Sequence, residues 1–185
     1  SLFERLVEMG IEPHLLRVQY RMHPSISLFP NERFYAGRLE DGVEAAQRPA
    51  PSGMLWPDWD QPMAFLPVQE GEVRSPDGNS KENPAEASWV SRVLEELLDG
   101  GELGMNDIGI ITPYAGQVRA IRDTMPERLD SVEVRTVDGY QGREKQVIIF
   151  SCVRSNSEGN VGFLADSRRL NVALTRAKRG LIVIG

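Results

Sequence analysis

The chain has 185 residues, of which 41% are apolar and 26% charged, a composition typical of one globular domain with a substantial core. The formal net charge of −6 argues against a protein that coats nucleic acid with a broad basic surface, although a narrow contact track needs only a few groups. A single cysteine excludes an internal disulfide and a zinc cluster, and no apolar run approaches the about 20 residues of a membrane helix. We therefore expect no membrane contact and a reducing location, the cytoplasm, with the nucleus as the alternative.

The start of the chain predicts two helices and a short strand. Residues 1–9 are expected to form an amphipathic helix that Gly10 ends, and because this helix has no visible start we expect the chain to belong to a longer protein. Residues 15–18 form an apolar run that predicts a short strand. Residues 24–35 predict a second helix, which Pro30 should kink or break because proline lacks the N–H of a helix interior.

The composition changes over residues 37–82, which are rich in Pro, Gly, Asp and Glu. Only residues 63–68 resemble a strand there. The W-P-D-W sequence of residues 56–59 predicts a turn, whose tryptophans are either platforms for base stacking or, as we favour, a satisfied surface clasp. Residues 74–83 predict a mobile loop. We therefore expect an irregular, loop-rich segment within the domain.

Strands and helices alternate in the rest of the chain. The first predicted elements are a helix over 85–98 ended by Gly100 and Gly101, a strand over 107–112 and a helix over 115–125. Strands over 132–137 and 145–153 and a polar loop over 155–162 follow. The last elements are a helix from Asp166 or Ser167, which carries Lys178 and Arg179 in its last turn and stops at Gly180, and a buried strand over 181–184. Because the apolar runs of the strands are continuous, we expect a mainly parallel sheet with helices on both faces. Such sheets bind ligands at the carboxyl ends of their strands, where we expect residues 19–21, 112–114 and 136–144.

The last predicted helix carries Arg169 and Arg176 on one flank, while its other flank is apolar and faces the sheet. This flank is either a solvated basic surface or a clamp for phosphate. The guanidinium group favours the clamp, because it is permanently charged and its planar fork matches phosphate oxygens. A positioned arginine also stabilises the charge that develops on a γ-phosphate during its transfer.

The sequence Q-Y-R-M-H-P directly follows the first predicted strand. Arg21 is placed where a phosphate can reach it, and Tyr20 can stack on a base, although a hydrogen-bonded strand end is an equal alternative. His23, which precedes Pro24, is expected to cap the next helix rather than to act as a catalytic base.

The sequence T-V-D-G-Y-Q-G-R-E, residues 136–144, is the densest polar segment. Two glycines bracket a polar turn, so its backbone N–H groups can approach an anion closely. Gln141 can orient a water molecule or a phosphate oxygen. Glu144 can accept hydrogen bonds from ribose hydroxyls, whereas a general-base role for it is disfavoured. Asp138 is expected to cap a helix.

The sequence I-T-P-Y-A-G-Q joins a strand to a helix. Thr112 at the strand end and the following helix N-terminus both suit a backbone phosphate, and Tyr114 can stack on a base, although a plain junction is an equal alternative. The sequence contains no P-loop and no carboxylate pair with a clear magnesium-binding placement. The chain can therefore contribute arginines to a nucleotide, but we expect it not to hold the phosphates and the metal unaided.

Four motifs in this order resemble the C-terminal motor-domain motifs of superfamily 1B helicases: Q-Y-R-M-H-P, I-T-P-Y, T-V-D-G-Y-Q-G-R-E-K and R-R-L-N-V-A-L-T-R-A-K. The resemblance is strongest to the up-frameshift type of RNA helicase, which acts in nonsense-mediated mRNA decay. The sequences S-L-F-E-R-L and F-Y-A-G-R-L-E-D-G-V also match that type, so the resemblance spans nearly the whole chain. Senataxin-like and immunoglobulin-mu-binding helicases are similar and stay as alternatives.

The resemblance implies that residues 1–185 form one domain, the second RecA-like domain of a two-domain helicase core. Its fold would be an α/β P-loop NTPase fold without its own P-loop, and ATP with Mg²⁺ would lie between the domains, with all metal ligands in the first one. By motif match the catalytic residues are Arg21, Arg176 and Gln141, and the nucleotide-binding residues are Tyr20, Gly142 and Glu144. The two arginines would act as fingers on the γ-phosphate, Glu144 would hold the ribose, and Tyr20 would lie near the base.

The resemblance also implies a track for single-stranded RNA, or alternatively DNA, with translocation in the 5′ to 3′ direction. The residues implied in this track are Thr112, Pro113, Tyr114, Thr136 and Val137. The implied partners besides nucleic acid are the N-terminal RecA-like domain of the same protein and decay or termination factors. Arg169 is expected to have a structural or coupling role. Lys178 stands where family members carry arginine, which changes little if the position only faces solvent.

Two other classes stay open, a non-catalytic nucleic-acid- or protein-binding module on the same fold and an unrelated doubly wound domain that binds another anion. A P-loop and an acidic magnesium motif upstream would favour the motor over the module. The motor prediction also has a geometric requirement, because the guanidinium groups of Arg21 and Arg176 must lie close together on one side of the sheet.

Overall fold

The computed structural model describes residues 2–185, and a five-stranded parallel sheet lies at its centre. The strands follow the order β3 (Met63–Leu66), β9 (Ala177–Ile184), β8 (Lys145–Ser151), β6 (Ile108–Thr112) and β7 (Glu133–Thr136). Each strand runs parallel to its neighbours. β6 is buried along its whole length and β8 from Val147 onward, as their continuous apolar runs predicted.

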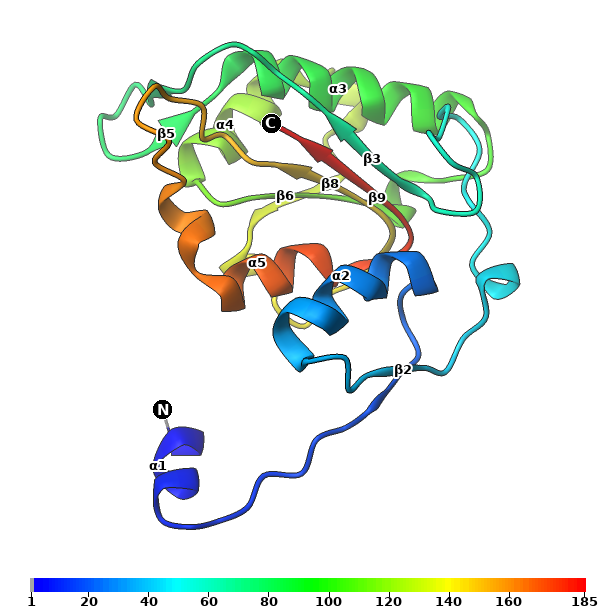
Figure 1. Cartoon of the computed structure of the whole chain (residues 1–185). Coiled ribbons are helices and arrows are strands. Elements are labelled where there is room, and N and C mark those ends of the chain that lie inside the picture. The colour runs from blue at the N-terminus through cyan, green and yellow to red at the C-terminus, as the bar shows by residue number, and fades with distance from the viewer. Residues whose placement is uncertain (1) are drawn as a thin grey trace.

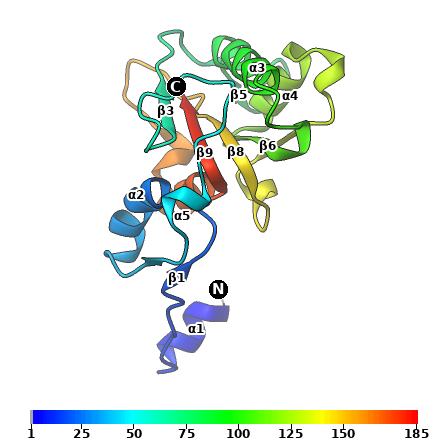
Figure 2. The same cartoon turned by 90° about the vertical axis from the view of Figure 1, so that its right-hand side faces the viewer.

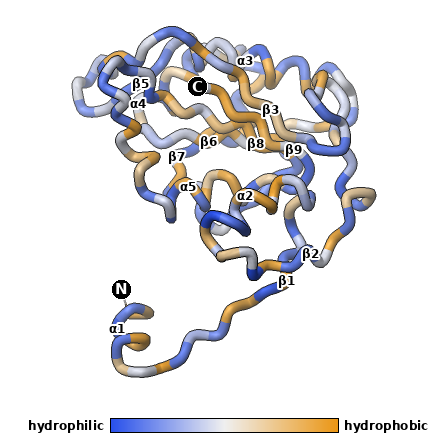
Figure 3. Tube along the Cα trace, in the orientation of Figure 1, coloured by the Kyte–Doolittle hydropathy of each residue, from blue (hydrophilic) through white to orange (hydrophobic). Residues whose placement is uncertain are grey.

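Helices cover both faces of this sheet (Figure 1). α3 (Pro84–Asp99) and α4 (Ala115–Thr124) lie on one face, and α2 (Pro24–Tyr35) and α5 (Ser167–Leu174) lie on the other. Each layer encloses a core with the sheet, which includes Val90 and Leu94 on the first side and Ile26 and Ala173 on the second. The trace is most hydrophobic in the central strands between the two layers (Figure 3). The fold is therefore α/β and of the RecA-like type, as predicted.

Local signals in the sequence set the helix starts. Asn83 caps α3 by accepting a hydrogen bond from the N–H of Glu86 at 3.2 Å. The Nδ1 of His23 caps α2 by accepting one from the N–H of Ser25 at 3.1 Å, which confirms the capping role expected for His23. α2 continues through Pro30, so the break expected as one of two outcomes is wrong, and the kink stays a prediction. Pro30 is buried together with Ile26 on the same helix, and this burial offsets the cost of the hydrogen bond that proline cannot donate.

The last predicted helix is shorter than its sequence suggested. α5 ends at Leu174, and β9 begins at Ala177, so Lys178, Arg179 and Gly180 belong to a strand and not to a helix end. Pairing with β8 decides this, because Ala177 and Gly180 lie opposite residues of that strand. Gly180 is needed for a close approach, since a Cβ there would meet the Trp56 ring at 2.7 Å.

The segment over residues 37–82 contains more regular structure than predicted. It includes β2 (Glu40–Asp41), which pairs in parallel with β1 (Val18–Gln19). The first predicted strand, over 15–18, is therefore displaced to β1 and lies outside the main sheet. β4 (Val73–Arg74) and β5 (Lys81–Glu82) form an antiparallel hairpin where a mobile loop was expected. The short 3₁₀ helices are η1 (Ala45–Gln47), η2 (Met105–Asp107), η3 (Glu127–Leu129), η4 (Asp138–Tyr140) and η5 (Gly162–Ala165).

The two tryptophans of the W-P-D-W turn have different environments. Trp56 is 4% exposed, and its Nε1 donates a hydrogen bond to the carbonyl oxygen of Pro51 at 2.7 Å. This side chain is therefore satisfied, as the favoured alternative expected, but it lies in the core and not on the surface. Trp59 is 54% exposed, so base stacking by its ring stays a prediction.

The first helix stands apart from the sheet. α1 (Leu2–Glu8) contributes no buried residue, and it lies away from the body of the domain in both views (Figures 1 and 2). The predicted helix over 1–9 is confirmed over these residues, whereas Ser1 lies outside the described part of the chain. No helix within residues 2–185 is both long enough and apolar enough to span a bilayer.

Candidate functional site

Two arginines that are far apart in the sequence meet around Thr175. The Nη1 of Arg21 donates a hydrogen bond to the carbonyl oxygen of Thr175 at 3.0 Å. The Nη2 of Arg176 donates one to the Oγ1 of the same threonine at 2.8 Å. The two guanidinium groups therefore flank a single residue on the α5 side of β9, which meets the geometric requirement of the motor prediction.

The fold fixes both arginines through backbone contacts. Arg21 follows β1, and its carbonyl oxygen accepts a hydrogen bond from the Nε of Arg48 at 3.0 Å. The next turn is tied to β9, because the N–H of His23 donates to the carbonyl oxygen of Lys178 at 2.8 Å. Arg176 lies between α5 and β9, and its Nε donates to the carbonyl oxygen of Val172 at 3.0 Å.

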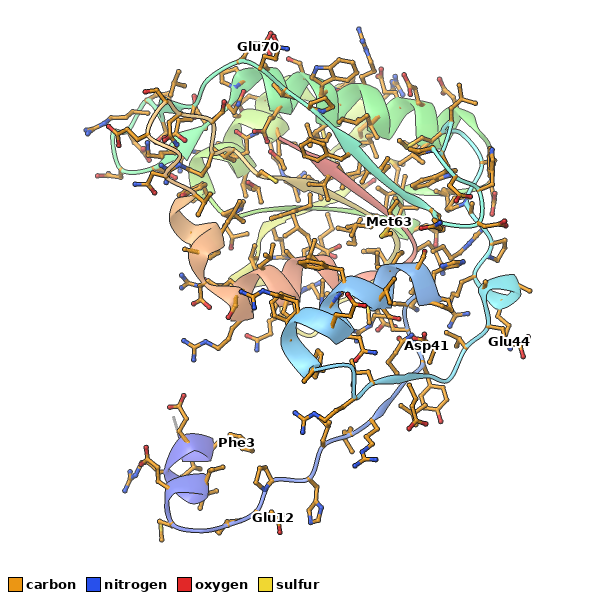
Figure 4. All side chains as sticks on the ribbon, in the orientation of Figure 1. Phe3, Glu12, Asp41, Glu44, Met63 and Glu70 are labelled. Carbon is orange, nitrogen blue, oxygen red and sulfur yellow. The ribbon has the colours of Figure 1, made fainter. Side chains whose placement is uncertain are left out.

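The loop that passes below α2 in Figure 4 also holds residues 19–21 in place. Asp41, labelled there, accepts hydrogen bonds from the Nε2 of Gln19 at 2.6 Å and from the Oγ of Ser27 at 2.7 Å. Gln19 in turn accepts from the N–H of Arg21 at 3.0 Å. The Q-Y-R sequence is therefore held in one conformation by side chains on both sides of it.

Glu144 is the counter-ion of this cluster. Its carboxylate binds the Nζ of Lys178 at 2.9 Å and the Nε of Arg21 at 2.5 Å. These hydrogen bonds, from Lys178 first and Arg21 second, lower the pKa of Glu144 to about 2. Glu144 is therefore ionised at neutral pH, and its carboxylate oxygens stay hydrogen-bond acceptors. Its predicted contact with a ribose stays a prediction.

Lys178 belongs to the site, although the sequence reasoning placed it at the solvated end of a helix. Arg176 immediately precedes β9 and Lys178 is the second residue of that strand, so both lie at the same end of β9, where Lys178 binds Glu144. A strand predicted to begin at Ala177 would have placed Lys178 in the site beside Arg176.

Positive charge exceeds negative charge in the cluster. Burial, and after it the nearby charge of Arg21, lower the pKa of Arg176. Arg21 and Lys178 bind the carboxylate of Glu144, and the same carboxylate is the negative charge that acts on Arg176. An anion placed beside the two guanidinium groups would relieve their mutual repulsion, so the site fits a phosphate-bearing ligand.

The cluster lies at the amino ends of β8 and β9, so the predicted position of this site at the carboxyl ends of the strands is wrong. Glu144 immediately precedes β8, and Arg176 immediately precedes β9. The reason is the parallel sheet itself, because the chain that leaves β7 at Thr136 must return to the opposite end before β8 begins. Arg21 follows β1, which lies outside the main sheet.

Gln141 and Gly142 lie on this return path. Both are exposed, and Gln141 lines a cavity of about 290 Å³ together with Arg169 and Val172. Val172 also accepts the hydrogen bond from Arg176, so the cavity adjoins the arginine cluster. The roles assigned to Gln141 and Gly142 near a phosphate stay predictions. Tyr20 is 66% exposed, and its stacking on a base stays a prediction as well.

Asp138 is not the helix cap that was expected. It lies inside η4, whose cap position is Val137, and its carboxylate pairs with Arg169 at 3.4 Å. Arg169 also pairs with Asp166 at 3.9 Å. These contacts give Arg169 the structural role that was one of its two expected roles.

Three of the five residues predicted for the nucleic-acid track are buried, namely Thr112, Pro113 and Val137. The Oγ1 of Thr112 is enclosed without a hydrogen-bond partner, and the N–H of Val137 donates to the carbonyl oxygen of Thr112 at 3.0 Å. Because these side chains are buried, they do not reach a nucleic-acid strand on the surface in this conformation. In this conformation, side-chain contacts are left to Tyr114 and Thr136, which are both partly exposed.

The described residues contain no group of three or more His, Cys, Asp or Glu side chains that could hold a metal ion. Cys152, next to the end of β8, is a free thiol, and burial raises its pKa to about 12.

A parallel sheet with helices on both faces, and with arginines gathered in the connections beside it, is typical of the nucleotide-dependent RecA-like proteins. A family described as "AAA domain" matches residues 1–185, so the chain belongs to this family.

Within the family, the chain is similar to regulators of nonsense transcripts. The Regulator of nonsense transcripts 1 homolog of Drosophila melanogaster is 47% identical over 192 residues, a match that covers 100% of this chain and 16% of that protein. ATP-dependent helicase NAM7 of Saccharomyces cerevisiae is 46% identical, with 100% and 20% covered. ATP-dependent helicase upf1 of Schizosaccharomyces pombe is 45% identical, with 100% and 21% covered. The predicted resemblance to the up-frameshift type is confirmed, and the chain spans about a fifth or less of these relatives.

A solved structure shares the fold over most of its length. It is described as the C-terminal domain of a possible DNA helicase from Lactobacillus plantarum, and it superimposes with a TM-score of 0.51 at 15% sequence identity. The match covers 90% of this chain and 87% of that one.

Proposed function

We propose that this chain is the second motor domain of an ATP-dependent RNA helicase of the nonsense-mediated decay type. In this proposal ATP and Mg²⁺ are held mainly by an N-terminal RecA-like domain of the same protein, and this chain adds arginines from the other side of the cleft. The observation that carries the proposal is the convergence of Arg21 and Arg176 on Thr175. Two relatives are named ATP-dependent helicases, which supports it further.

The residues of the cluster fit a triphosphate. Each guanidinium has five N–H donors, and the contacts to Val172 and Thr175 use only part of them. Bound ATP would supply the phosphoanhydride that is cleaved. Arg21 and Arg176 would bind its terminal phosphate and stabilise the charge that develops there, while Glu144 would stay ionised and accept hydrogen bonds from the ribose.

We further propose that Tyr114 and Thr136 contact the backbone and bases of single-stranded RNA, with DNA as the alternative. Such contacts carry little sequence information, because every nucleotide offers a phosphate and a π-face. If both domains hold one strand, domain closure around ATP would move them along it, in the 5′ to 3′ direction that the resemblance implies. Decay or termination factors are proposed as further partners. We also propose the cytoplasm as the site of action, and the free thiol of Cys152 suits that reducing compartment.

The decisive experiment is Arg176→Ala in the full-length protein. We expect ATP turnover to fall by about a thousandfold while ATP binding largely survives, because the arginine acts on charge that develops during transfer. Arg92→Ala is the matched control, since Arg92 is exposed on α3 and stacks on Trp89 at 4.9 Å, away from the cluster. Turnover within twofold of the wild type, about the experimental error, would refute the role of Arg176.

A second arm tests the split site. We expect residues 1–185 alone to hydrolyse no ATP, because the P-loop and the magnesium ligands are proposed to lie in the other domain. Robust hydrolysis by this fragment, after removal of contaminating ATPases, would contradict the proposal.

A further inference from the structure

Phe163 lies between the proposed nucleic-acid contact and the helix that leads to Arg176. η5, which carries Phe163, immediately precedes α5, and in Figure 1 this segment descends from the level of α4 and β5 to the start of α5. The N–H of Phe163 donates a hydrogen bond to the hydroxyl oxygen of Tyr114 at 3.3 Å. The two rings lie 6.2 Å apart between centroids at an angle of 56°. Tyr114 is thus joined to η5 by a hydrogen bond and by a ring contact.

The Phe163 ring also contacts α5. The guanidinium carbon of Arg169 lies 4.0 Å from the centroid of this ring, which is a close cation–π contact. Arg169 lies in the first turn of α5, and the last turn of the same helix provides the Val172 carbonyl that holds Arg176. A short helix is a rigid connector, so movement at Phe163 would be passed to Arg176.

The contact with Tyr114 leaves little free space. Gly162 has φ of +53°, and a Cβ at this position would lie 2.0 Å from the Nη1 of Arg154 and 2.6 Å from the hydroxyl oxygen of Tyr114. Arg154 itself donates to that hydroxyl at 3.4 Å. Because the glycine fits closely against both groups, a shift of the tyrosine displaces η5 rather than being absorbed by a gap.

A second contact reaches the same helix from β7. Asp138, two residues after Thr136, pairs with Arg169 at 3.4 Å. The start of α5 is therefore held from both strand ends that carry the proposed nucleic-acid contacts. Arg169 is the point where the two connections meet.

We propose that Phe163 is a positioning residue that couples a single strand at Tyr114 to the placement of Arg176 at the nucleotide. This inference rests on the proposed function. Without a bound strand, α5 and Arg176 are held less firmly in the orientation that hydrolysis needs. A strand that stacks on Tyr114 fixes its hydroxyl, and with it Phe163, Arg169 and α5.

The test uses Phe163→Leu in the full-length protein, because leucine keeps an apolar side chain but removes the π-face that Arg169 contacts. ATP turnover is measured with and without a single-stranded oligouridylate, whose affinity is measured by fluorescence anisotropy. We expect stimulation by the strand to fall by about tenfold, while basal turnover and strand affinity change by less than about twofold. Phe29→Leu is the matched control, because Phe29 is 51% exposed on α2 and packs on Phe34.

Tyr114→Phe is the second variant. It keeps a ring for stacking and removes only the hydroxyl that accepts from Phe163 and Arg154. We expect a smaller loss of stimulation, by about threefold to fivefold, with strand affinity again nearly unchanged. A thermal melt of each variant reports folding, so a loss that follows from unfolding is recognised by a lowered melting temperature.

Three outcomes would overturn the coupling role: unchanged stimulation in Phe163→Leu, equal losses of basal and stimulated turnover in a folded variant, or a wild type that the strand does not stimulate. Arg176→Ala separates this inference from the proposed function. If that variant loses turnover while Phe163→Leu stays normal, the coupling role alone fails. If Arg176→Ala keeps turnover, the proposed function fails first.

Discussion

The two ends of the central sheet differ in how their charged side chains are paired. In the cluster at the amino ends of β8 and β9, Arg21 and Lys178 bind the carboxylate of Glu144, and Arg176 lies within reach of its charge without contacting it. Burial and the charge of Arg21 lower the pKa of Arg176, so this positive charge is held at some cost to the folded state. The amino end is therefore prepared for an anionic ligand.

At the carboxyl ends, the carboxylates are surrounded by donors. Glu86 is fully buried, and it accepts hydrogen bonds from the Oγ of Ser151 at 2.6 Å and from the N–H of Val153 at 2.9 Å. Glu72 binds Arg154 at 2.6 Å and also pairs with Lys81. These contacts join the end of β8 to α3 and to the β4–β5 hairpin. The carboxyl end is therefore a rigid support for the loops that carry Tyr114 and Thr136.

This contrast predicts which substitutions should reduce activity and which should reduce stability. Removing a cation at the amino end should cost activity and little stability, because its partner is proposed to be a ligand. Removing a carboxylate at the carboxyl end should cost stability first, because its partners belong to the fold.

The largest effect on stability is expected for Glu86→Ala. The change leaves Ser151 and the N–H of Val153 without their buried acceptor and opens a cavity, so we expect the free energy of unfolding to fall by about 3 kcal/mol. Urea unfolding measures it. Glu95→Ala is the matched control on the same helix, since Glu95 pairs with Arg128 on the surface and should change stability by less than about 1 kcal/mol.

Glu86→Gln sharpens the same comparison. Burial raises the pKa of Glu86, so the charged form is already disfavoured, and a neutral amide of the same shape should cost much less than alanine. If glutamine and alanine destabilise the protein equally, the charge of Glu86 holds this end together rather than its hydrogen bonds, and the comparison as drawn is wrong.

The sequence was informative where the signal is local. The apolar runs of β6 and β8 predicted a parallel sheet, and the resemblance carried by the motifs around Arg21 and Arg176 implied a shared site. It was misleading where a distant partner decides the structure. Ala177, Lys178 and Arg179 are good helix formers, yet pairing with β8 makes them part of a strand, and this displacement also hid the place of Lys178 in the site.

Nothing in the local sequence predicted the buried hydrogen bonds that Glu86 accepts from Ser151 and Val153. Glu86 occupies a first helical turn, where a glutamate is ordinarily a solvated residue that suits the helix dipole. Its burial follows from Ser151 and Val153, which lie more than sixty residues away in the sequence. The two-residue strands of the β4–β5 hairpin were equally hidden, because so short a pairing leaves no alternating pattern to read.

The smallest effect is expected for the pH dependence of stability at Glu144. The ion pairs with Lys178 and Arg21 lower its pKa from 4.5 to about 2 in the folded protein. A carboxyl group whose pKa is depressed by folding adds stability above its unfolded pKa and loses this contribution as the pH falls toward the folded value. Glu144→Gln removes that contribution and should therefore lower stability at neutral pH, but progressively less in acid.

Because the Glu144 side chain is 39% exposed, solvent screening reduces the expected difference at pH 7 to about 1 kcal/mol. Urea unfolding of wild type and Glu144→Gln from about pH 7 to pH 3 should show the gap narrowing below about pH 4.5, whereas Glu12→Gln, on the exposed stretch after α1, should leave the curve unchanged. A gap that stays constant down to acid pH would mean that Glu144 is not the ionic partner of this cluster. Arg21 and Lys178 would then lack the one carboxylate that the described residues offer them as an ion pair, and the excess of positive charge in the cluster would be larger than the contrast between the two ends assumes.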